Sequence, residues 1–90
     1  MIGGKMIDSI QKEYAMRSKL PEIVRQREIE LGRRISIKEL ADQTGLNRNT
    51  ISSWLSPTPF GRVDSHSAIT LRRWANCSWD DLLEEVELNL

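Results

Sequence analysis

The sequence predicts an all-α fold, and two observations support this. Apolar residues recur at the spacing of amphipathic helices along the 90-residue chain, and β-branched and aromatic residues do not form the alternating runs of half-buried strands. A chain of this length makes one small domain with a thin core. We expect an N-terminal arm over residues 1–17, flexible or weakly helical, followed by a domain of five helices over residues 18–90.

The arm has two interpretations. Ile7, Ile10 and Tyr14 are spaced for a weak amphipathic helix, which could serve as a dimerisation arm, while a frayed terminus is the simpler alternative. The first firm helix begins near Leu20. Pro21 suits the first helical position, where its missing N–H is not needed. An apolar stripe precedes the stop at Gly32, and its members are Leu20, Ile23, Val24 and Leu31.

The second and third helices are short and separated by a few residues. Ser36 and Glu39 have the spacing of a capping box, and Gly45 supplies a left-handed stop. Asn47 then caps the third helix. The expected inner faces are Leu40, Ala41 and Thr44 on the second helix and Ile51, Trp54 and Leu55 on the third.

The third helix ends before Pro57 and Pro59, and a long loop follows. A fourth helix is capped by Asp64 or Ser65, carries Ala68, Leu71, Arg72 and Ala75, and stops at Asn76. Ser78 caps a fifth helix, whose apolar side is formed by Leu82, Leu83 and Val86.

The side of the third helix that faces away from the core is rich in small polar residues. Arg pairs two-fold with guanine and Asn pairs two-fold with adenine, while Ser reads either base weakly. A surface helix without a ligand favours Glu, Lys and Gln, which form helix more readily. The residues Arg48, Asn49, Ser52 and Ser53 therefore indicate a face that reads DNA bases, with a plain polar surface as the alternative.

Charge is distributed unevenly along the chain. Residues 17–77 hold eleven Lys and Arg against six acids, whereas residues 78–90 hold five acids and no base. A basic body with an acidic tail is consistent with nucleic-acid binding, although charge alone favours a solvated surface without a ligand.

Several function classes are not supported by the sequence. Cys77 is the single cysteine and His66 the single histidine, so we expect no disulfide, metal site or cofactor. No Gly-rich phosphate loop or catalytic constellation is visible, and an enzyme is not expected. No run approaches the ~18 apolar residues of a membrane span, so a cytoplasmic location is expected.

Two segments, "IKELADQTGLNRNTISSWL" and "NCSWDDLLE", resemble the Cro/phage-repressor type of helix-turn-helix regulators, the XRE-like family. The resemblance covers about residues 20–86 and implies a five-helix, repressor-like fold that binds operator DNA, usually as a two-fold dimer. The family's base-reading positions fall on Asn47, Arg48, Asn49 and Ser53, with Ser52 nearby. Its DNA-backbone positions fall on Ser36 and Lys38, and the loop after the third helix offers Arg62.

The chain also departs from the family pattern. Ile37 stands where many relatives have a Gln that braces the first reading residue, and Leu55 stands where a Glu often pairs with an Arg of the first helix. The leading hypothesis is a sequence-specific regulator of transcription that binds double-stranded DNA. The alternative is an antitoxin or adaptor that uses its acidic tail to bind a partner protein. The expected dimer surfaces are the C-terminal helix, through Leu83, Val86 and Leu88, and the arm, through Ile7 and Ile10.

Overall fold

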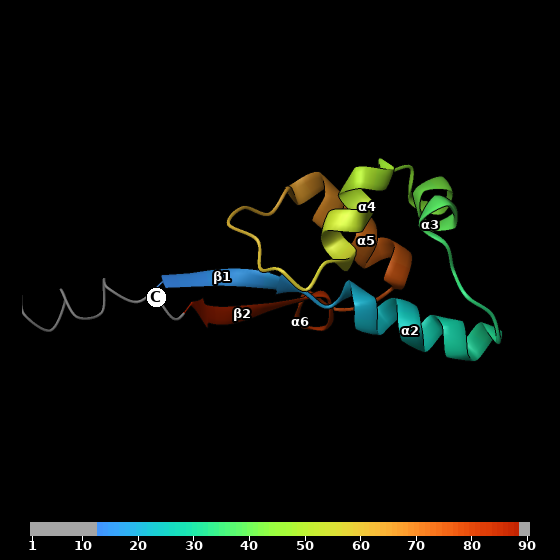
Figure 1. Ribbon diagram of the computed structural model, residues 1–90, viewed down its shortest axis with the longest axis horizontal. Helices are drawn as coiled ribbons and strands as arrows, with labels where there is room; N and C mark the ends of the chain where they lie inside the picture. Colours follow the sequence, from blue (N-terminus) through green and yellow to red (C-terminus); the bar gives the residue numbers. More distant parts are fainter. Residues whose placement is uncertain (1–12, 89–90) are drawn as a thin grey trace, which may run out of the picture.

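Five helices and a two-stranded ribbon make up residues 13–88, the part of the chain that this computed structural model describes (Figure 1). The ribbon is formed by the first and last of these elements, and the helices lie between them in sequence. The elements in chain order are β1 (Glu13–Ser18), α2 (Leu20–Leu31), α3 (Ile37–Thr44), α4 (Arg48–Leu55), α5 (Ser65–Ala75), α6 (Trp79–Leu82) and β2 (Leu83–Leu88).

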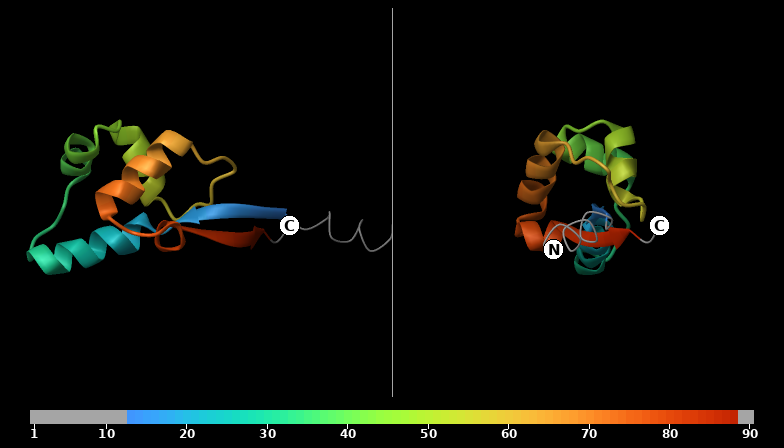
Figure 2. Two further views of the ribbon diagram at one scale, coloured as in Figure 1. Left: turned by 180° about the vertical axis from the view of Figure 1, so that it is seen from behind. Right: turned by 90° about the vertical axis from the view of Figure 1, so that its left-hand side faces the viewer.

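The ribbon makes the prediction of an all-α fold wrong in part. β1 and β2 pair antiparallel in a register that runs from Ser18 opposite Leu83 to Glu13 opposite Leu88. Arg17 and Glu84 lie directly opposite one another and form a salt bridge of 2.6 Å. The ribbon extends away from the helical body, as the left view in Figure 2 shows.

The predicted fifth helix is much shorter than expected. Ser78 caps α6 as predicted, because its hydroxyl accepts a hydrogen bond from the Asp81 N–H at 3.2 Å. The helix nevertheless ends at Leu82, because the backbone of Leu83 is extended and continues into β2. Val86 and Leu88 therefore lie on a strand rather than on a helix, and pairing with β1 determines their conformation.

The described part of the arm is also extended. Residues 13–17 belong to β1, so Tyr14 lies on a strand and not on a weak helix. Ile7 and Ile10 lie outside the described residues.

The predicted ends of the first four helices are confirmed. Ser36, Asn47 and Asp64 each accept a hydrogen bond from a backbone N–H in the first turn of their helices. Gly32, Gly45 and Asn76 have left-handed backbone conformations directly after α2, α3 and α5.

The core lies where α2, α3, α4 and α5 meet, and α6 closes one end of it. Each helix buries at least one residue of its predicted apolar stripe, and the others are half-buried except Leu31, which is 52% exposed at the end of α2. Ile35 and Leu46 come from the loops on either side of α3. The buried apolar residues are Leu20, Val24, Ile35, Leu40, Leu46, Ile51, Trp54, Ala68, Leu71 and Leu82.

Candidate nucleic-acid interface

A tight turn between α3 and α4 determines how these two helices cross. Gly45 adopts φ of 75°, and its N–H donates to the carbonyl of Ala41 at 2.8 Å. The Thr44 hydroxyl donates to the Leu40 carbonyl at 2.7 Å and accepts from the Leu46 N–H at 3.2 Å. Leu46 is buried, so the turn is held both by hydrogen bonds and by packing against the core.

Helix α4 has a buried side and a polar side. Ile51 and Trp54 are buried, and the Trp54 ring packs against Phe60 with ring centroids 5.0 Å apart. The opposite side is exposed, and at 3.6 residues per turn it covers an arc of about 140°. It consists of Arg48, Asn49, Ser52 and Ser53, and we call it the reading face after the role that was predicted for these residues.

Asn47 is exposed beside the reading face, but part of its side chain is already engaged. Its Oδ1 atom accepts a hydrogen bond from the Asn49 N–H at 2.7 Å, which caps α4. The side-chain NH₂ group of Asn47 remains free to donate hydrogen bonds to a base.

The start of α3 exposes Ser36 and Lys38. Ser36 Oγ accepts from the Glu39 N–H at 3.1 Å, so its hydroxyl hydrogen is available to a ligand oxygen. The capping box is only half formed, because the Glu39 carboxylate accepts two hydrogen bonds from Arg33 at 2.9 Å instead. Hydrogen bonding to the Arg33 guanidinium lowers the pKa of Glu39, and the same contact raises the pKa of Arg33.

Arg62 is exposed on the loop between α4 and α5. This loop is anchored two residues earlier, where the Phe60 N–H donates to the Met16 carbonyl of β1 at 2.7 Å. The Phe60 side chain meanwhile contacts Trp54. Phe60 thus connects the loop to both the ribbon and α4, and it limits how far Arg62 can move from α4.

Positive charge is available around the two helices. Among the described residues, the salt bridges join Arg17 to Glu84 and Arg33 to Glu39, so no described carboxylate pairs with Lys38, Arg48 or Arg62. Helix α4 contains no acid. Glu85 of β2 lines the same hollow as Phe60 and Gly61 of the loop between α4 and α5, but it forms no salt bridge with Arg62.

Other kinds of site find no support in this part of the chain. Within residues 13–88, no group of three or more His, Cys, Asp or Glu residues is placed to hold a metal ion. None of the described helices has both the length and the apolar character needed to cross a membrane. Partial burial raises the pKa of Cys77, so its thiol is poorly suited to act as a nucleophile.

The family of Cro/C1-type helix-turn-helix DNA-binding domains matches residues 20–87, which include all five helices and most of β2. The chain belongs to this family. No similar curated protein and no similar solved structure was found. The family assignment agrees with the short turn at Gly45 that joins α3 to α4. It identifies the chain as a DNA-binding domain.

Two features of this Cro/C1-type domain were missed in the sequence. Phe60 lies in a loop with no periodic pattern, and its contacts to Met16 and Trp54 are set by tertiary structure alone. Arg34 is exposed beside Ser36, where both line a hollow at the start of α3. The adjacent Arg33 and Arg34 could have indicated positive charge at the start of α3. The sequence did not show, however, that Arg33 pairs with Glu39 whereas Arg34 has no described acidic partner.

Proposed function

We propose that this Cro/C1-type domain is a sequence-specific regulator of transcription that places α4 in the major groove of double-stranded DNA. The observation that carries the proposal is the composition of the reading face. Its side chains are short or forked hydrogen-bonding groups, they are exposed, and they lie opposite the buried Ile51 and Trp54. The protein acts in the cytoplasm in this proposal, without a cofactor and without enzymatic activity.

Arg48 and Asn49 are the principal base-reading residues. Each can make two hydrogen bonds to one base, Arg48 to guanine and Asn49 to adenine. Asn47 donates through its free amide group, while Ser52 and Ser53 read neighbouring bases or their sugars. Because these residues occupy the first two turns of α4, that end of the helix enters the groove most deeply.

Ser36, Lys38 and Arg62 contact the DNA backbone. Ser36 and Lys38 lie at the start of α3, where exposed N–H groups and the helix dipole favour a phosphate. Arg62 reaches a phosphate from the loop that Phe60 anchors. Contacts on both sides of α4 hold the helix at a fixed depth in the groove, whereas the base contacts select the sequence.

Two copies bind one operator in this proposal. A single α4 reads too few base pairs to distinguish one site among the many competing sites of a genome. The copies meet through the apolar face of the ribbon that carries Ala15, Val86 and Leu88. These residues are half-buried, and the strand register places all three on one face. Leu83 packs against the core and is not part of this surface.

Selection of binding sites from random duplex DNA tests the proposal. We expect an enriched pseudo-palindrome, and an affinity for it that falls as salt rises, because the contacts to phosphates release counterions. A single-stranded oligonucleotide of the selected sequence is the control. Binding without an enriched motif would reduce the function to nonspecific DNA binding, and no binding to duplexes would refute it.

A further inference from the structure

The outer edge of β2 exposes backbone groups that can accept another strand. On β1, the Met16 carbonyl points away from β2, because it accepts the N–H of Phe60 from the other side. Backbone groups alternate along an antiparallel ladder, so it is Ala15 and Arg17 that bond to Val86 and Glu84. The backbone N–H and C=O groups of Glu85 and Glu87 therefore point outward, away from β1.

Among residues 13–88, no strand pairs with this outer edge. The Leu83 N–H is occupied, because it donates to the Trp79 carbonyl at the end of α6. For the outward groups of Glu85 and Glu87, the described residues provide no backbone partner. An extended peptide laid beside β2 would satisfy these groups and add a third strand to the ribbon.

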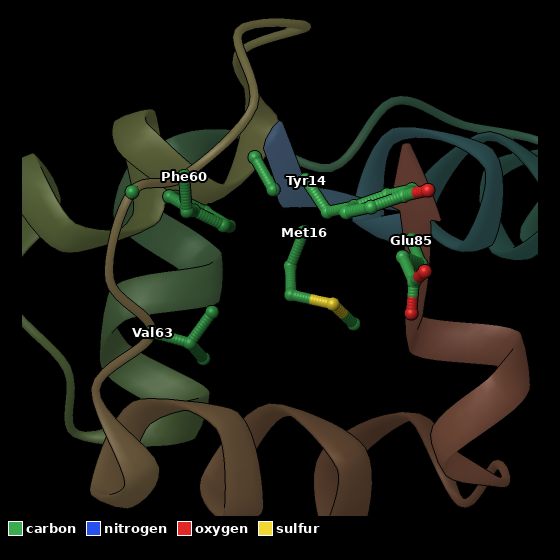
Figure 3. Close-up of a pocket in the computed structure, with 7 residues that line it drawn as sticks. Tyr14, Met16, Phe60, Val63 and Glu85 are labelled. Atoms are coloured by element: carbon green, nitrogen blue, oxygen red, sulfur yellow. The ribbon is translucent and has the colours of Figure 1, made fainter. Parts of the chain in front are cut away.

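The two faces of β2 differ in charge. Glu84 points to one face, where Arg17 neutralises it at 2.6 Å. Glu85 and Glu87 point to the other face, opposite Met16 and Tyr14, and no described residue forms a salt bridge with either. Figure 3 shows Glu85 beside Tyr14 and Met16, on the side of the ribbon that looks towards Phe60.

These charges select against a second copy of the chain at this edge. If two β2 strands paired antiparallel in the registers that overlap most fully, Glu85 of one copy would lie opposite Glu85 or Glu87 of the other. Like charges directly opposite one another destabilise a strand pair, and charged residues on an edge are a common protection against such pairing. A strand with Lys or Arg at these positions would instead be stabilised.

We propose that the outer edge of β2 binds an extended segment of a partner protein that alternates basic and apolar residues. Its Lys or Arg side chains lie beside Glu85 and Glu87, and its apolar side chains lie beside Val86 and Leu88 on the other face. Its backbone bonds to the outward groups of β2. This interaction does not use α4 and leaves the reading face free.

Titration of the intact protein with a seven-residue capped peptide that alternates valine and lysine tests the proposal. We expect amide hydrogen exchange to slow at Glu85 and Glu87, whose N–H groups gain a partner, and to change little at Glu84 and Val86, which β1 already protects. Glu85→Gln combined with Glu87→Gln should weaken the peptide about 2-fold to 30-fold, as expected for two exposed ion pairs. Glu84→Gln is the matched control and should change the affinity less than about 2-fold.

A second pair of variants separates the backbone contribution from charge. Glu85→Pro removes the outward N–H as well as the carboxylate, so it should weaken the peptide more than Glu85→Gln does. Both variants should retain the affinity of the wild type for DNA, which shows that they fold. No binding at millimolar peptide would overturn the proposal. Equal binding of a valine–glutamate peptide would do so as well, and so would dimers of the wild type that pair along the outer edge of β2 in place of peptide binding.

Discussion

Arg48 and Trp54 lie on opposite sides of α4 and show how differently two residues of one short helix can act. Arg48 is exposed and has no described acidic partner, so its guanidinium is available to a base. Trp54 is 3% exposed and packs against Phe60. Substitution of the first should therefore change DNA binding without unfolding the domain, and substitution of the second should unfold it.

We expect Arg48→Ala to weaken specific DNA binding by ~1–3 kcal/mol and to relax the preference at one base pair, because a two-fold contact to a guanine is lost. Arg25→Ala is the control: it removes the same charge from an exposed position on α2, outside the α3–α4 pair. Selection on random duplexes with all three proteins measures the effect. An unchanged sequence preference in Arg48→Ala would contradict its assignment as a reading residue.

Trp54→Ala should destabilise the domain by ~3–5 kcal/mol, the usual cost of removing a buried aromatic side chain and leaving a cavity. Trp79 offers a comparison, since it is 45% exposed, and Trp79→Ala should cost much less. Denaturation by urea gives both values. A Trp54 variant as stable as the Trp79 variant would mean that the packing of Trp54 on Phe60 contributes little.

The turn between α3 and α4 shows how a single backbone angle can affect the stability of the domain. Gly45 has φ of 75°, and no atom lies within 4 Å of where a Cβ would be placed. We expect Gly45→Ala to destabilise the domain by ~1–2 kcal/mol through left-handed backbone strain alone. Gly61→Ala is the matched control, because its surroundings are equally open and its φ is not positive. Thermal melts that show equal losses for the two variants would argue against strain as the cause.

The cap of α5 predicts a dependence of stability on pH. Hydrogen bonds from the Ser67 hydroxyl and N–H lower the pKa of Asp64 below its usual value. The contribution of Asp64 to stability is therefore complete above pH ~4, the range of an unfolded Asp, and is lost as the pH falls through the lower folded pKa. Asp64→Asn caps the helix but does not titrate, so the advantage of the wild type in thermal stability over this variant should shrink between pH 5 and pH 2. An advantage that stays constant over this range would contradict the prediction.

Elements determined by local sequence could be predicted, and those determined by distant partners could not. Ser36, Gly45 and Asn47 cap helices within a few residues of their own positions. The start and end of α3 and the start of α4 could therefore be predicted from the sequence. The segment 83–88 contains adjacent glutamates that obscure strand alternation, and its pairing partner lies near the other end of the described chain. For the same reason, the dimer surface was expected on a C-terminal helix, whereas Val86 and Leu88 lie on strand β2. The base-reading and backbone roles of the candidate residues stay predictions.

For the whole molecule, the proposed function predicts two copies on each operator. We expect a pseudo-palindromic site with half-site centres ~10 base pairs apart, because one helical turn brings both copies to the same side of the duplex. Sedimentation with saturating operator DNA measures the stoichiometry, and a duplex with one half-site scrambled is the control. A footprint of one half-site with one protein per duplex would rule out the dimer.

The ribbon joins the first and last described elements of the chain, and this has a consequence for synthesis. Residue 13 is paired with residue 88, so β1 leaves the ribosome long before its partner exists. The segments of α2, α3 and α4 can form local contacts as they emerge, whereas the loop that anchors through Phe60 must wait for β1 to become ordered. Completion of the fold therefore depends on the synthesis of β2, and a nascent chain arrested before residue 83 would leave β1 without its pairing partner.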